Sequence, residues 1–351
     1  MKLTRSIFLL ASLPCLLKAG EPLSIDPAPP ANRWRFGVSF APIFNVDASF
    51  SGLGGFSSPF TPQPLGAGVN REYEDGYVFV DSSGNAGGAT WNWGYENASQ
   101  YNPAGAGSID QHLHNSAANG HADEENQMAP AIEMFAYLDM GKVGDLSAGP
   151  VNWGFRGGVH YAHLSVSNSD AITSDVIRLT DSFSLGGGVV PGAPYQGSFN
   201  GPGPLLSDDP TRTTTVISNG ALVQGRRELD VDMLTLSVGP YLEIPVAPRF
   251  SILAEAGVNV ALVRGDYQFD SLTTLTGLGS QSTRGDDSRT VILPGLYAGV
   301  SATWKQSDSF SWIGSARYQY LDAFEITTGG SRATLDFDGA AVISIGGLWN
   351  Y

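Results

Sequence analysis

The sequence predicts an all-β fold, an antiparallel up-and-down barrel of eight strands that crosses a membrane and carries long extracellular loops. Three observations predict it. Eight long segments place apolar side chains on every second position, which is the period of a β-strand. The connections between these segments are alternately short and long. The composition, with 44 Gly, 7 Trp, 13 Tyr and 17 Phe but only 15% charged residues, suits many strands and turns.

The N-terminus has the pattern of an export signal. Lys2 and Arg5 precede an apolar run over 7–17, and small residues follow it. We therefore expect residues 1–20 to be a signal peptide. Residues 21–32 contain several prolines and are predicted to form a short periplasmic tether before the barrel of residues 33–351.

Charge and cysteine content exclude several classes of function. Cys15, the single cysteine, lies in the predicted signal, so the exported chain has no thiol for a disulfide, a metal or a nucleophile. Without residues 1–20 the chain has 16 basic against 34 acidic residues, a net charge of −18. Such a surface repels nucleic acid. We expect no nucleic-acid partner and no cofactor.

The eight predicted strands are long enough to span a bilayer at a steep tilt, which takes about 9 to 11 residues. Segment 249–268 shows the two faces most clearly. Ile252 and Val258 lie on an apolar face that suits lipid, while Glu255 and Asn259 lie on the other. The predicted strands are 33–44, 128–140, 150–167, 228–245, 249–268, 289–304, 310–326 and 332–351.

The connections favour a membrane barrel, because outer-membrane barrels have short turns on one side and long loops on the other. Short turns are predicted at 141–149, 246–248 and 305–309, and loops at 45–127, 168–227, 269–288 and 327–331. With a periplasmic N-terminus, an even number of strands places every long loop outside the cell. We therefore expect the chain in the outer membrane of a Gram-negative-type bacterium.

Charged residues on the face opposite the lipid nearly balance in sign. The interior of an eight-stranded barrel is filled by its own side chains, so we expect these residues to form an ion-pair network that plugs the lumen. A conducting or proton-relay role is the alternative. The predicted lumen residues are Arg35, Glu133, Asp139, Arg156, Glu243, Glu255 and Arg317.

The chain resembles the small outer-membrane barrels of the OmpA type over residues 33–44 and 128–351. The last segment, AAVISIGGLWNY, carries the resemblance most specifically, because its apolar residues alternate and it ends in an aromatic residue. The resemblance implies that Trp349 and Tyr351 form the signal recognised by the barrel-assembly machinery, although the family usually ends in Phe. It also implies contact with outer-membrane lipid and lipopolysaccharide. We expect no peptidoglycan-binding domain.

The first long loop contains two alternating runs joined by a Ser-Gly-Asn turn, which predicts a hairpin. Trp91, Trp93 and Tyr95 share one face of its second arm. If exposed, they can stack on sugars or hold a partner. Alternatively they pack on the barrel rim, or the hairpin enters the membrane and raises the number of strands to ten.

Three further groups of residues have the side chains of a metal site or a catalytic site. Asp110, His112 and His114 have side chains that bind divalent ions, but their spacing matches no strong zinc signature, so we expect a solvated loop and no metal. The acidic pairs 208–209 and 286–287 can bind calcium loosely, and we expect them to be solvated as well. His163 and Ser165 faintly resemble the His-Ser pair of lipid A deacylase barrels, but the rest of that motif is missing.

Nothing in the sequence requires catalysis, so we expect no enzyme. The favoured function is a structural or surface-interaction role in the outer membrane, with an extracellular ligand that the loops do not identify. A narrow pore or small-solute transporter is the first alternative. A lipid-modifying enzyme is the second.

Overall fold

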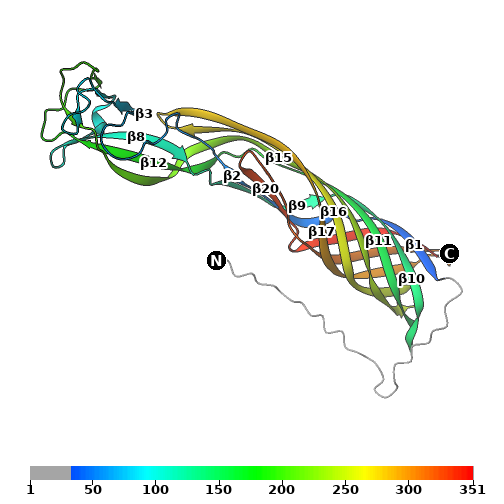
Figure 1. The fold of residues 1–351 in the computed structure, drawn as a ribbon. Helices are drawn as coiled ribbons and strands as arrows, with labels where there is room; N and C mark the ends of the chain where they lie inside the picture. Colours follow the sequence, from blue (N-terminus) through cyan, green and yellow to red (C-terminus); the bar gives the residue numbers. More distant parts are fainter. Residues whose placement is uncertain (1–32, 351) are drawn as a thin grey trace.

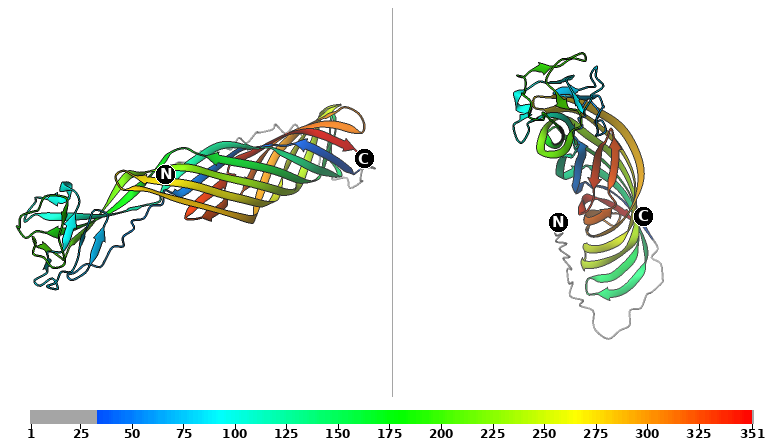
Figure 2. Two further views of the ribbon diagram at one scale, coloured as in Figure 1. Left: turned by 90° about the horizontal axis from the view of Figure 1, so that it is seen from above. Right: turned by 60° about the vertical axis from the view of Figure 1, so that its left-hand side comes forward.

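The computed structural model describes residues 33–350, which form an elongated all-β molecule (Figure 1). A barrel stands at one end, a small domain of short strands stands at the other, and long strands join the two (Figure 2). The predicted signal peptide, the tether and Tyr351 lie outside the described residues.

Eight strands close into a ring, and every pairing within the ring is antiparallel. Since β21 pairs back with β1, the ring leaves no unpaired edge. This is the closed antiparallel barrel that the sequence and the resemblance predicted. In ring order the strands are β1 (Trp34–Phe40), β10 (Ala131–Leu146), β11 (Gly149–Asn168), β15 (Thr211–Ala247), β16 (Phe250–Leu275), β17 (Gly279–Lys305), β18 (Phe310–Leu321) and β21 (Ala340–Asn350).

The central strands of the ring extend far beyond the predicted bounds. β15 has 37 residues and begins at Thr211 instead of 228. The predicted loop at 269–288 is wrong, because β16 and β17 continue as a hairpin until Leu275 pairs with Gly279. These extensions run from the barrel toward the distal domain (Figure 1).

The alternation of side chains inverts along these long strands, and this inversion explains the error. In β16, Val258 and Leu262 face outward and are exposed, while Asn259 on the other face is buried. Beyond Leu262 the outward positions become polar, beginning at Arg264, and the inward positions become apolar, as at Val263. β15 inverts in the same way next to its partner strand. A strand predicted from one continuous apolar face therefore ends at the inversion, although the strand in the structure continues.

Four shorter strands complete the wall beyond the barrel, opposite the extensions. β2 pairs with β21, β20 and β9, and β19 pairs with β20. The predicted strand 33–44 is thus split at 41–42, and the predicted strands 310–326 and 332–351 are each split in two. The four strands are β2 (Ile43–Leu53), β9 (Gly120–Ala129), β19 (Phe324–Thr328) and β20 (Ser331–Asp336).

The distal domain is built from both predicted long loops, 45–127 and 168–227. The first contains the predicted hairpin together with further strands, and the second contains strands that the sequence did not predict. β12 pairs with both β8 and β15 and so connects this domain to the long strands. Its elements are β3 (Arg71–Tyr73), β4 (Gly76–Val78), β5 (Ala89–Thr90), β6 (Trp93–Tyr95), η1 (Ala98–Gln100), β7 (Tyr101–Asn102), β8 (Ser108–Ser116), β12 (Ile172–Ser184), β13 (Tyr195–Gln196) and β14 (Leu206–Ser207).

Among the described residues no helix has the length and the apolar character needed to cross a membrane.

Candidate functional site

The barrel interior contains a cluster of four buried charges. Glu133 on β10 accepts hydrogen bonds from Arg156 on β11 at 2.6 Å and from two nitrogens of Arg317 on β18 at 2.7 Å each. Glu255 on β16 lies 3.3 Å from Arg156 and 3.9 Å from Arg317. Two carboxylates therefore face two guanidiniums. All four side chains are at most 7% exposed.

The other three predicted lumen residues form a second cluster toward the short turns. Arg35 lies 3.0 Å from Asp139 and 2.9 Å from Glu243, and it also donates to the Tyr241 hydroxyl at 3.1 Å. A polar cavity of about 280 Å³ opens beside this cluster and is lined partly by residues of the turns. The structure thus places the seven residues of the predicted network in two separate clusters.

An apolar core fills the interior beyond these charges, between the long strands and the wall formed by β2, β9, β19 and β20. Ile43 and Phe50 of β2, Val231 of β15 and Phe324 of β19 are all buried in it. A void of about 10 Å³ lies within this core, which is at most the space of one water molecule. Along the described residues, an ion-pair layer and an apolar core therefore fill the interior of the barrel and of the wall beyond it.

The predicted aromatic hairpin exists, but its aromatic side chains are buried. β4 and β6 pair antiparallel, as expected for the two arms. Trp93 is 0% exposed and Tyr95 3%. Both pack in a core of the distal domain together with Phe183 of β12, and Trp91 is half-buried. Neither an exposed platform nor a ten-stranded barrel results, because the hairpin pairs with β13 of the second long segment and its aromatic side chains pack against residues of β8, β12 and β14.

A buried ionic group that the sequence did not indicate lies in the same domain. Asp181 is fully buried, accepts a 2.6 Å hydrogen bond from the Tyr73 hydroxyl, and binds Arg212 through two 2.7 Å bonds. Burial, and then the hydrogen bond to Asp181, raises the pKa of Tyr73. Three polar residues from distant segments show no pattern in the sequence, so only the fold brings them together.

The predicted weak metal candidates do not converge on one point. Each histidine has its own carboxylate: Nδ1 of His112 lies 2.6 Å from Asp75, and Nδ1 of His114 lies 2.6 Å from Glu74. Asp110 accepts a hydrogen bond from the Ser182 hydroxyl. Over residues 33–350 no group of three or more His, Cys, Asp or Glu side chains is arranged to hold a metal.

The His163 and Ser165 pair lies on the outer surface of β11. Nδ1 of His163 is 3.0 Å from Asp232, which also accepts a hydrogen bond from the Tyr161 hydroxyl. In the described part of the chain no hydrogen bond links His163 to Ser165. His163 therefore has an acidic partner, Asp232, that the sequence did not indicate. It does not hydrogen-bond to the Ser165 hydroxyl, which would have to act as the nucleophile.

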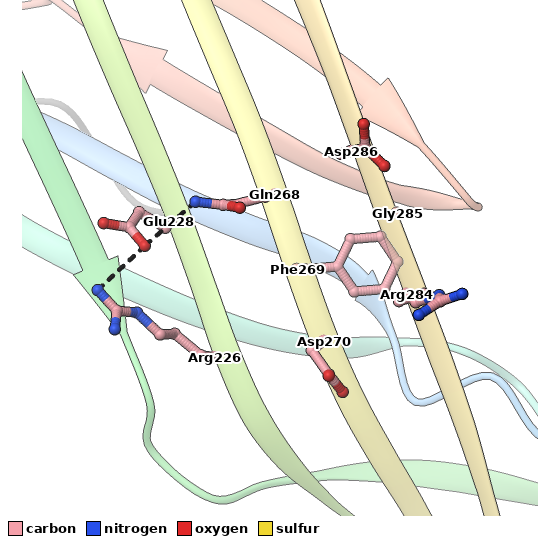
Figure 3. A pocket seen from close by; sticks show the side chains of 8 residues that line it. All are labelled: Arg226, Glu228, Gln268, Phe269, Asp270, Arg284, Gly285 and Asp286. Atoms are coloured by element: carbon pink, nitrogen blue, oxygen red, sulfur yellow. Dashed lines mark hydrogen bonds and ion pairs between the residues drawn. The ribbon is translucent and has the colours of Figure 1, made fainter.

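A surface hollow of about 550 Å³ lies on the outer wall formed by β15, β16 and β17 (Figure 3). Its residues carry both signs of charge, and Glu228 binds Arg226 at 3.0 Å. Asp286 is exposed on this wall, as expected for a solvated carboxylate, although it lies on a strand and not in a loop. The hollow shows that the surface beyond the inversion is polar.

Comparisons with known proteins are limited to structures. No family model and no curated protein matches the sequence. The attachment invasion locus protein Ail of Yersinia pestis, in complex with the heparin analogue sucrose octasulfate, matches with 8% identity and a TM-score of 0.25, over 90% of this chain and 99% of Ail. The outer membrane protease OmpT of Escherichia coli matches with 6% identity and a TM-score of 0.30, over 94% of this chain and 99% of OmpT.

Proposed function

We propose that this chain is a non-conducting outer-membrane barrel that holds a compact domain away from the cell surface, where that domain interacts with the environment. The observation that carries the proposal is the inversion of side-chain alternation in β15 and β16. Outward apolar and inward polar side chains suit lipid, and the reverse arrangement suits water. One strand with both arrangements has one part in a membrane and one part outside it.

The height of the apolar belt supports this assignment. In β16 the outward apolar positions run from Phe250 to Leu262. Twelve residue steps of about 3.3 Å, tilted by about 40°, rise about 30 Å, which is the thickness of a bilayer's hydrocarbon core. Exposed tryptophans mark the end of the barrel that carries the short turns, with Trp34, Trp304 and Trp349 between 42% and 55% exposed. Such aromatics form the interfacial girdle of membrane barrels.

Membrane insertion is tested by fractionation and heat-modifiability. We expect the protein in the outer-membrane fraction, and a shift in its gel mobility on boiling, because a closed barrel resists detergent until heated. Recovery of the protein in a detergent-free soluble fraction would contradict the assignment. The exposed apolar side chain of Trp349 on β21 is consistent with the proposed assembly signal. Replacing Trp349 with Ser should reduce the amount of folded barrel.

The non-conducting role rests on the filled interior. Planar-bilayer recordings of the purified protein should show no steady open state. A stable conductance of porin size would instead support the alternative of a narrow pore. In that event, the path would have to pass both the Glu133 cluster and the apolar core.

Exposure of the distal domain outside the cell is tested by protease shaving of intact cells. An epitope inserted beside Val189, which is 86% exposed, should be accessible to antibody without permeabilisation. We also propose that the chain has no catalytic activity on lipid. His163→Ala and Ser165→Ala should leave the lipid A of producing cells unchanged, and altered lipid A would oppose this.

A further inference from the structure

Asp208, in the second long segment, has a carboxylate that is buried without a complete set of partners. The residue is 0% exposed and lies in the distal domain directly after β14. Its Oδ2 accepts hydrogen bonds from the Gly68 N–H at 2.6 Å and from the Asn85 amide at 2.9 Å. Its Oδ1 is buried and has no hydrogen-bond partner among the described residues. The expectation of a solvated acidic pair is therefore wrong for Asp208, because the first long segment folds over it.

A second buried carboxylate, Asp81, is joined to Asp208 through one asparagine. Asp81 is 2% exposed. The Asn85 side chain accepts a 2.9 Å hydrogen bond from the Asp81 N–H, and it donates to Asp208. Oδ1 of Asp81 accepts a hydrogen bond from the Ser83 hydroxyl at 2.6 Å, and its Oδ2 accepts one from the backbone N–H of Trp91 at 3.1 Å.

The carboxylate of Asp208 has no cationic partner within the described part of the chain. Over residues 33–350, no Lys, Arg or His nitrogen forms an ion pair with its carboxylate. The nearby Arg71 is buried, but it donates to the backbone oxygens of four residues, one of which is the Asp208 carbonyl at 2.9 Å. Arg71 therefore lowers the local negative charge without satisfying the carboxylate. A buried charge of this kind is normally paired or bound to a metal.

There is space beside the free oxygen. A Cβ added to Gly88 would have only Asp208 Oδ1 within 4 Å, at 3.7 Å. Gly88 is half-buried, has a φ of +73°, and its carbonyl accepts a hydrogen bond from the Asp208 N–H. The loop 81–88 therefore leaves a position next to Oδ1 that no side chain fills.

We propose that Asp208 and Asp81 bind a Ca²⁺ ion together with neutral oxygens of the 81–88 loop, and that this ion locks the two long segments together. Ca²⁺ prefers carboxylate, amide and carbonyl oxygens and tolerates irregular geometry. Ser83 supplies a neutral hydroxyl oxygen two residues after Asp81, and backbone carbonyls of the loop supply others. Two carboxylates and a neighbouring Arg71 suit the weak affinity of extracellular calcium modules, with Kd values on the order of 0.1 to 1 mM.

The first test is Tb³⁺ luminescence of the full-length protein refolded in detergent. The backbone N–H of Trp91 donates to Asp81 at 3.1 Å, so a bound Tb³⁺ ion would lie near a tryptophan that can sensitise it. We expect emission on excitation of tryptophan, and loss of this emission on adding millimolar Ca²⁺ but not equal Mg²⁺. Absence of a Ca²⁺-displaceable signal would overturn the proposal, and this test needs no variant to fold.

The second test compares Asp208→Asn with a matched control. The Asp286→Asn/Asp287→Asn variant removes an exposed acidic pair instead. Asp208→Asn should weaken Ca²⁺ binding at least tenfold and abolish the upward shift of several degrees that Ca²⁺ causes in the melting of the distal domain, while the control keeps both. Heat-modifiability shows that the barrel of each variant is folded, and a cooperative melting transition of the distal domain in EGTA shows that this domain is folded. Equal stabilisation by Asp208→Asn in Ca²⁺ and in EGTA would mean that Asp208 is a buried acid without a metal.

Discussion

Replacing Glu133 with Gln removes the carboxylate that binds both Arg156 and Arg317. The change keeps the size of the side chain but leaves two buried guanidiniums facing Glu255 alone, at 3.3 and 3.9 Å. Breaking a buried ion pair by removing one partner costs about 3 to 5 kcal/mol, because the remaining charge is left uncompensated in a low-dielectric interior. We expect a loss of that size in the free energy of unfolding.

The assay is urea unfolding of the protein in lipid vesicles, followed by tryptophan fluorescence. Glu325→Gln is the matched control, because Glu325 lies 3.7 Å from Arg332 and both side chains are about half exposed. An exposed pair contributes about 0 to 1 kcal/mol, so this variant should unfold nearly like the native protein.

The result that would refute the reasoning is a loss for Glu133→Gln no larger than that for Glu325→Gln. It would mean that water reaches the lumen charges and screens them. The same variant should then be examined for conductance, because a hydrated ion-pair layer is the first requirement of a pore through this barrel.

Three further predictions concern the lipid face, the distal core and acid pH. Leu236→Arg places a charge on an outward position that is 54% exposed, and it should cost about 2 to 4 kcal/mol in vesicle unfolding; a neutral effect would mean that β15 does not face lipid there. Trp93→Ala should cost the distal domain about 3 to 5 kcal/mol, seen as faster proteolysis of that domain with unchanged heat-modifiability of the barrel. Burial would raise the pKa of both Glu74 and Asp81, but hydrogen bonds, chiefly from His114 and Ser83 respectively, lower it. The stabilisation that ionised Glu74 and Asp81 give to the distal domain is complete above about pH 5, and it is lost as the pH falls through their lowered folded-state pKa values. The melting temperature of the distal domain should therefore decrease as the pH falls below about 4. A melting temperature that stays constant over that range would mean that these hydrogen bonds do not stabilise the domain.

The sequence was most informative where a strand crosses the apolar belt. There, the outward positions carry apolar side chains at a regular period of two, so residues such as Val258 and Glu255 could be assigned to opposite faces from their spacing alone. The same alternation placed Glu133 and Arg317, 184 residues apart, on the inner face. Their pairing follows because a narrow closed barrel brings all inner positions close together.

Outside the belt, the alternation of apolar and polar residues no longer predicts the strands, because the outer face meets water. Once the outer face meets water, polar residues occupy it, and a strand such as β15 before 228 no longer differs in pattern from a solvated loop. The sequence predicts the hairpin that contains Trp93, but the burial of Trp93 depends on strands of the second long segment, 168–227.

By itself the sequence determined that this chain forms a barrel, which strand faces point outward with apolar side chains, and which charges lie inside, because one repeated physical demand acts on every second residue. The tertiary structure alone decided that the two long segments fold into one domain, that His112 and His114 bind separate carboxylates, and that Asp208 is buried with a free oxygen. Those features depend on contacts between segments distant along the chain, and no local periodicity records such contacts.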